Sequence, residues 1–119
     1  MNGRLDRGQR DALALLASIQ NDAAVSAQML TIESVQGSPT TAKLTCPNGV
    51  PVSAFPDGPA PGKLAVVDDA GELAGELVLW LSGGEIDLVE QTWYSEHPPT
   101  ALPGRGSVAR YRDLGFDMR

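Results

Sequence analysis

The sequence predicts an α+β fold: an N-terminal helix packed on a small antiparallel meander sheet, followed by an extended, proline-rich C-terminal segment. Three observations predict it. Apolar residues at helical spacing begin the chain, alternating segments separated by turn residues fill its second half, and 13 Gly and 9 Pro among 119 residues favour short elements. A chain of this length supports one core, so we expect a single domain over residues 1–103 and an Arg-containing tail or short helix over 104–119.

The N-terminal helix is expected over residues 4–20. Gly8 weakens its first turn by about 1 kcal/mol, which leaves residues 9–20 as the secure part. The apolar residues form a single stripe, and a helix with one apolar stripe needs a sheet to pack against. The residues of the stripe are Leu5, Ala12, Leu13, Leu16 and Ile19.

Short strands are expected after the helix. Residues 25–35 alternate and favour a strand, although their pattern also fits a helix. Residues 40–46 and 50–55 flank the turn Pro47-Asn48-Gly49 and predict a hairpin, in which Pro51 confines the second strand to an edge. Further strands are predicted over the following segments: 64–68, 76–82 and 85–94, with a bulge at Gly75.

In a regular hairpin about Gly83-Gly84, the side chains of the last two strands would alternate between the two faces of the sheet. Regular pairing places Leu77 opposite Glu90 and Trp80 opposite Asp87. The face that carries Leu77 is nearly all aliphatic, so we expect it to pack on the core. Glu90 and Tyr94 would then be structural polar residues on the core side, and the Glu90 carboxylate would be paired with a tail arginine or with backbone amides, or be protonated.

The opposite face combines two tryptophans with three carboxylates, a composition typical of a recognition surface. Alternatively, the rest of the chain covers this face and its tryptophans form a second small core. The expected partner-binding residues are Trp80, Trp93, Glu76, Glu85, Asp87 and Gln91.

Charge and composition restrict the partners. The net charge is −6, and residues 57–96 hold nine acidic side chains and one basic one, Lys63. Such a surface disfavours nucleic acid, whose binding relies on Lys and Arg, and suits a basic protein. No apolar run is long enough to span a membrane, and the single cysteine, Cys46, fits a reducing compartment. We therefore expect a cytoplasmic protein.

No catalytic, metal or cofactor site is expected. His97 is the only histidine, and no motif orients a Cys46/His97 dyad. The acidic residues between 68 and 76 lack the spacing of a calcium loop, and Gly104-Arg105-Gly106 is only part of a phosphate-binding loop. The sequence favours a binding protein over an enzyme.

Residues 75–103, about a quarter of the chain, carry a pattern of Gly-Glu, an apolar strand, a Gly turn, a strand ending in Val-Glu, an aromatic, an acidic residue and prolines. The segment resembles the C-terminal hairpin of a group of small uncharacterised bacterial proteins common in actinomycetes. A fainter similarity extends from Leu15 to Leu44, without the cysteines that relatives often carry near Gly37. The resemblance implies a helix followed by an antiparallel sheet and assigns no activity. The matching positions are Gly75, Glu76, Gly84, Val89, Glu90, Tyr94, Glu96, Pro98, Pro99 and Pro103.

Three classes of function follow from these patterns. The leading hypothesis is a non-catalytic cytoplasmic protein-binding domain, in analogy with immunity proteins, that neutralises a basic toxin through its acidic, Trp-containing sheet face. The second is a small-ligand-binding protein or enzyme with a pocket near Glu90, Tyr94 and His97. The third is a homodimer joined through the sheet face or the edge strand that contains Pro51.

Overall fold

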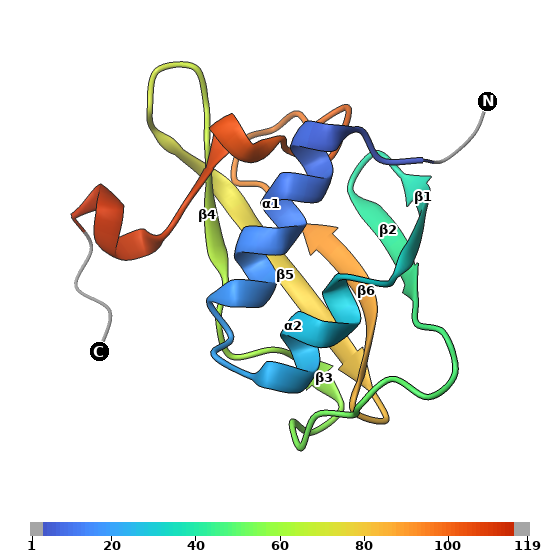
Figure 1. Cartoon of the computed structure of the whole chain (residues 1–119). Coiled ribbons are helices and arrows are strands. Elements are labelled where there is room, and N and C mark those ends of the chain that lie inside the picture. Colours follow the sequence, from blue (N-terminus) through green and yellow to red (C-terminus); the bar gives the residue numbers. More distant parts are fainter. Residues whose placement is uncertain (1–3, 116–119) are drawn as a thin grey trace.

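The structure, a computed structural model, describes residues 4–115, and of Val35 and Gln36 it describes only the backbone. It confirms the α+β class: within the described residues two α-helices pack on one curled antiparallel sheet of seven strands (Figure 1). The elements are α1 (Arg7–Ser18), α2 (Ala23–Met29), β1 (Glu33–Ser38), β2 (Thr41–Thr45), β3 (Gly58–Pro59), β4 (Leu64–Val67), β5 (Leu73–Ser82), β6 (Glu85–Gln91), the 3-10 helix η1 (Arg105–Ser107), β7 (Val108–Ala109) and the 3-10 helix η2 (Tyr111–Leu114).

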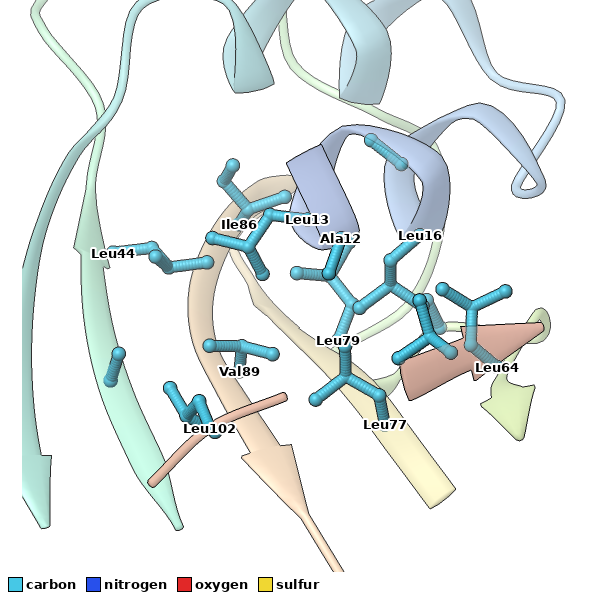
Figure 2. Close-up of a cluster of buried hydrophobic side chains, with 14 of the residues drawn as sticks. Ala12, Leu13, Leu16, Leu44, Leu64, Leu77, Leu79, Ile86, Val89 and Leu102 are labelled. Carbon is cyan, nitrogen blue, oxygen red and sulfur yellow. The ribbon is translucent and has the colours of Figure 1, made fainter. Parts of the chain in front are cut away.

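The strand order is β1-β2-β6-β5-β4-β7, and β3 pairs with β5 beyond the end of β4. Both α-helices lie on the same face of this sheet (Figure 1). The core fills the space between the helices and that face, where side chains of α1 meet those of β2, β4, β5 and β6 (Figure 2). The molecule therefore has two layers, and the extents of 43 × 41 × 22 Å make it thin in one direction.

The first helix begins where the sequence supplies a cap. The Asp6 side chain accepts a hydrogen bond from the backbone N–H of Gln9, and the Gln9 side chain accepts one from the backbone N–H of Asp6. This reciprocal capping box satisfies two backbone donors that a helix start would otherwise leave unpaired. Gln9 also donates to the carbonyl of Leu102, which ties the helix start to the C-terminal segment.

The strand expected over residues 25–35 is wrong in its first part, which forms α2. Asp22 caps this helix by accepting a hydrogen bond from the backbone N–H of Val25. The buried residues Val25 and Gln28 lie three residues apart, which places them on one face of a helix, whereas the alternating apolar residues of the segment also fit a strand. The N-terminal cap decides between the two, and the strand begins only at Glu33.

Gln28 holds the second helix to the sheet. Its side chain is fully buried, donates to the carbonyls of Pro51 and Gly84 and accepts from the backbone N–H of Ile86. These bonds satisfy a buried amide and fix the loop around Pro51 against the β5–β6 turn. The strand expected over residues 50–55 is wrong: the segment is a loop, because its backbone groups bond to this turn and to side chains instead of to a partner strand. The edge strand with Pro51, through which the homodimer hypothesis would join two copies, does not form.

The hairpin of β5 and β6 contains a bulge that changes the faces of β6. Gly83 and Gly84 form the expected turn, both with positive φ, and Leu81 pairs with Ile86 as expected. The next pair is Trp80 with Leu88, so Asp87 is an extra residue. From Leu88 onward every side chain of β6 lies on the face opposite to the one that regular pairing predicts.

Two sequence predictions are therefore wrong. Glu90, expected on the core side, points away from the helices, and Gln91, expected on the open face, is buried with 5% of its surface exposed. Aliphatic residues occur at both alternations of β6, so the pattern alone does not choose between them. The bulge buries a neutral amide and leaves the carboxylate outside, which costs less free energy than the reverse.

Residues from the expected tail join the sheet. β7 pairs with β4, and Val108 of β7 and Leu102 before it belong to the buried core. Gly75 lies next to the irregular pairing of β4 with β5, where Ala74 is the extra residue. A bulge is thus present close to the position that the sequence indicates.

Candidate binding surface on the outer sheet face

The side chains of β2, β5 and β6 that point away from α1 and α2 form one continuous surface, which we call the outer sheet face. Within residues 4–115 both α-helices lie on the other side of the sheet, so no α-helix covers this face (Figure 1). Register places cross-strand neighbours side by side on it. Its members are Thr41, Lys43, Glu76, Val78, Trp80, Leu88 and Glu90.

Trp80 and Glu90 are bonded to one another. Trp80 pairs with Leu88 and Val78 pairs with Glu90, so the tryptophan and the carboxylate occupy diagonal positions. The indole Nε1 of Trp80 donates a hydrogen bond of 3.1 Å to Oε1 of Glu90. Val78 is only 5% exposed because Trp80 and Glu90 flank it on the same face. Trp80 itself is half-buried, so part of its side chain remains exposed to a partner.

A second aromatic side chain holds a second carboxylate. The hydroxyl of Tyr111 donates to Oε2 of Glu76. β4 lies between β7 and β5, so Tyr111, two residues after β7, crosses β4 to reach Glu76 on β5. Ala65 of β4 pairs with Glu76 and is completely buried. Burial, followed by the hydrogen bond to the Glu76 carboxylate, raises the pKa of Tyr111, because both favour the protonated phenol.

The bulge residue Asp87 forms an ion pair with Lys43. Lys43 pairs with Leu88 in the register of β2 and β6, so this ion pair lies beside the apolar Leu88 and Trp80. Both side chains are about half exposed, at 58% for Lys43 and 41% for Asp87, so the pair contributes little stability, on the order of 0–1 kcal/mol.

The other predicted binding residues are spread out. Glu85 is half-buried and pairs with Ser82 at the turn end of the hairpin. Trp93 is 42% exposed and lies five residues beyond Leu88, the pairing partner of Trp80. At the rise of an extended chain this separates Trp93 from the Trp80–Leu88 pair by about 16 Å along the strand direction. The structure therefore does not bring the two tryptophans together. Gln91 points to the core, and its Oε1 has no hydrogen-bond partner among the described residues.

Sequence reasoning missed four members of the surface, Thr41, Lys43, Leu88 and Glu90, and also Tyr111, which contacts it. Leu88 was missed because of the bulge, and Lys43 because the pairing of β2 with β6 joins distant segments. Tyr94, expected on the core side, is 59% exposed and lies close enough to Tyr111 to help raise its pKa. Tyr111 lies in the expected tail, and nothing in the sequence pattern indicates that it contacts Glu76.

The residues considered for catalysis do not assemble. Cys46 approaches the carbonyl of Ile86, near the start of β6, whereas His97 follows the other end of β6 and is exposed. Burial, followed by the nearby Glu85 carboxylate, raises the pKa of the Cys46 thiol, which opposes its activation as a nucleophile. Among residues 4–115 no three His, Cys, Asp or Glu side chains are grouped to hold a metal ion.

The pocket expected near Glu90, Tyr94 and His97 has no support in the geometry. Glu90 is engaged by Trp80 on the open face, and Tyr94 and His97 are exposed. Two cavities of about 490 and 330 Å³ are lined by other residues.

Among the described residues no helix is both long and apolar enough to cross a membrane. Comparisons of the chain with protein-family models, with curated proteins and with solved structures give no match. The resemblance to the actinobacterial group therefore stays a prediction.

Proposed function

We propose that this protein is a non-catalytic binding domain that captures a basic protein partner on its outer sheet face. The proposal rests on two carboxylates of the outer sheet face that aromatic side chains hold in place by hydrogen bonds. Glu90 is held by Trp80 and Glu76 is held by Tyr111. Both lie on the sheet face opposite to the one that the two described α-helices cover.

Holding these carboxylates in place favours binding of a cation. Ordering a flexible side chain at an interface costs about 0.5–1.5 kcal/mol, and the aromatic donors have already ordered Glu76 and Glu90 in the free protein. A carboxylate has lone pairs for about four hydrogen bonds, so each can still accept from an Arg or Lys of the partner. Trp80 and Leu88 between the charges supply the apolar contact area that interface centres need.

The charge of the surface argues for a basic partner. Glu76, Glu85, Asp87 and Glu90 lie on or beside the outer sheet face, against the one cation Lys43 among its members. Complementary charge speeds association and selects against acidic proteins. An immunity protein that neutralises a basic toxin is the specific form of this proposal, and the net charge of −6 fits it.

Affinity capture with matched charge-reversal variants tests the proposal. The immobilised chain is exposed to an extract of its source cells, captured proteins are identified by mass spectrometry, and the enriched one is purified for calorimetry. We expect a basic protein that binds at one-to-one stoichiometry, with binding lost in Glu90→Arg and strongly weakened in Trp80→Ala.

The control is Asp11→Arg, which makes the same charge change on an exposed position of α1, on the helix side. It should leave capture unchanged. Equal capture by Glu90→Arg and Asp11→Arg would reject the outer sheet face as the binding surface. Melting temperatures of all variants show whether a loss of binding reflects unfolding instead.

A further inference from the structure

A groove at the edge of the molecule lies between the end of α1, the loop before β4 and the segment that contains β7 and η2. Its volume is about 490 Å³. Lys63, Arg110 and Arg112 line it, together with the apolar side chains of Ile19 and Pro61 and with Tyr111. The groove and the outer sheet face meet at Tyr111.

The charge of this groove is opposite to that of the chain. Three of the nine Lys and Arg residues line it and no acidic residue does, although the net charge of the protein is −6. Within residues 4–115 the one ion pair joins Lys43 to Asp87, so Lys63, Arg110 and Arg112 are not paired with a described carboxylate. Like charges gathered without a counterion repel one another, and an anion bound between them would relieve that repulsion.

Asp22, which follows the groove residue Asn21, and the last carbonyls of α1 are already engaged elsewhere. The Asp22 carboxylate accepts from the backbone N–H of Val25 and from the hydroxyl of Ser53, on the side of α2. The carbonyl groups of residues 15–18, at the negative end of α1, all accept hydrogen bonds within the turn that ends the helix. Gln20 supplies one of these bonds. The helix end therefore presents bonded carbonyls to the groove, not free acceptors.

The walls of the groove are held in place. Gln20 is buried, donates to the carbonyl of Gly62 and accepts from its backbone N–H, which fixes the loop beside Lys63 to the end of α1. Arg110 stands between β7, which pairs with β4, and η2. Fixed backbone on both sides reduces the ordering cost of binding a ligand.

We propose that this groove binds a small organic anion that carries a phosphate or carboxylate group on a flat apolar body. Arg110 and Arg112 offer planar guanidinium groups, which bind such oxyanions through two parallel hydrogen bonds, and Lys63 adds a third positive charge. Ile19, Pro61 and the ring of Tyr111 contact the apolar body, as in small-molecule sites where a few polar groups orient the ligand.

Calorimetric titration of the whole chain at low ionic strength with phenyl phosphate, benzoate and inorganic phosphate tests this site. We expect saturable binding of phenyl phosphate or benzoate that is weakened at least about tenfold in Arg110→Gln and in Arg112→Gln. The better of the two probes identifies the anionic group. Inorganic phosphate should bind more weakly than phenyl phosphate, since it lacks the apolar body.

The matched control is Arg7→Gln, which removes the same charge from an exposed position on α1 outside the groove. Its affinity for the probes should equal that of the wild type. Cations near the C-terminal end of a helix also stabilise that helix. If wild type binds no probe saturably, the proposal is overturned, and a lower melting temperature of Arg110→Gln would then show that the cations stabilise α1 instead. Equal weakening by Arg7→Gln would overturn it as well.

Discussion

The indole of Trp80 donates a 3.1 Å hydrogen bond to the carboxylate of Glu90 across two neighbouring strands, on the face of the sheet that the α-helices leave open. The contact exists because Asp87 is an extra residue in β6. Without that bulge Glu90 would point to the core and would need a buried counterion. The bulge thus places Glu90 on the outer sheet face and Val89 in the core.

The Trp80–Glu90 hydrogen bond is expected to contribute about 0.5–1.5 kcal/mol to the free energy of unfolding. Trp80→Phe keeps the ring and removes the donor, whereas Glu90→Leu removes the acceptor. Urea denaturation of both single variants and of the double variant should give a coupling free energy of at least about 0.5 kcal/mol. Trp93→Phe, at an exposed position, is the control and should show no coupling to Glu90→Leu. Purely additive effects of Trp80→Phe and Glu90→Leu would refute the bond.

Gln91→Leu is expected to stabilise the protein by about 1 kcal/mol. The Gln91 side chain is 5% exposed and its Oε1 lacks a partner among the described residues, so an apolar replacement of similar size removes an unsatisfied buried acceptor. Regular pairing without the bulge would instead place residue 91 on the open face, where leucine brings no gain. Urea denaturation measures the difference, and a loss of stability would contradict the register described here.

Gly75→Ala is expected to destabilise the protein by about 1–3 kcal/mol. A Cβ atom at Gly75 would lie 2.0 Å from the backbone carbonyl oxygen of Thr92, so the chain leaving β6 would have to move. The control is Gly106→Ala, because a Cβ atom there meets no other atom within 4 Å. Thermal denaturation of both variants checks the prediction. Similar melting temperatures for the two would show that β6 does not pass Gly75 as closely as described.

Tyr111 is expected to make stability fall at high pH. Its pKa is raised in the folded state, so folding favours the protonated phenol. The stabilisation is complete below the pKa of tyrosine in the unfolded chain, about 10, and is lost as the pH rises above that value. Urea denaturation as a function of pH should show a steeper loss above pH 10 in wild type than in Tyr111→Phe. In Tyr94→Phe, where Tyr111 is the remaining tyrosine of the two in the chain, phenolate absorbance should appear only with unfolding. Absorbance that precedes unfolding would contradict the Tyr111–Glu76 contact.

Sequence patterns predict the class of fold because strong local signals set it. Helical spacing with the Asp6 cap gives α1, and the Gly83-Gly84 turn between apolar segments gives the hairpin of β5 and β6. The patterns fail where two structures share one apolar pattern. Residues 23–29 fit a strand or a helix, and an aspartate cap at residue 22 decides for the helix.

The residues of the outer sheet face depend on the one-residue shift in the pairing of β5 with β6 at Asp87. Only part of the face could therefore be predicted from the sequence. Trp80 and Glu76 lie on the open face as expected, since β5 alternates regularly there. Asp87 is the bulge residue and remains on this side, bonded to Lys43. Glu90 and Gln91 exchange faces because β6 has aliphatic residues at both alternations, so hydrophobicity does not select the register. The contribution of Tyr111 comes from a strand pairing of distant segments, which one sequence does not reveal.

Site-specific photo-crosslinking tests the proposed binding face most directly. A photoreactive phenylalanine analogue is placed at Leu88, on the outer sheet face, or at Leu30, an 87% exposed residue at the end of α2 on the helix side. Each variant is irradiated in its source cells, and crosslinked proteins are identified by mass spectrometry. We expect a crosslink from position 88 to a basic protein and none from position 30. Crosslinks from position 30 alone, or from position 88 only to a second copy of this chain, would contradict it.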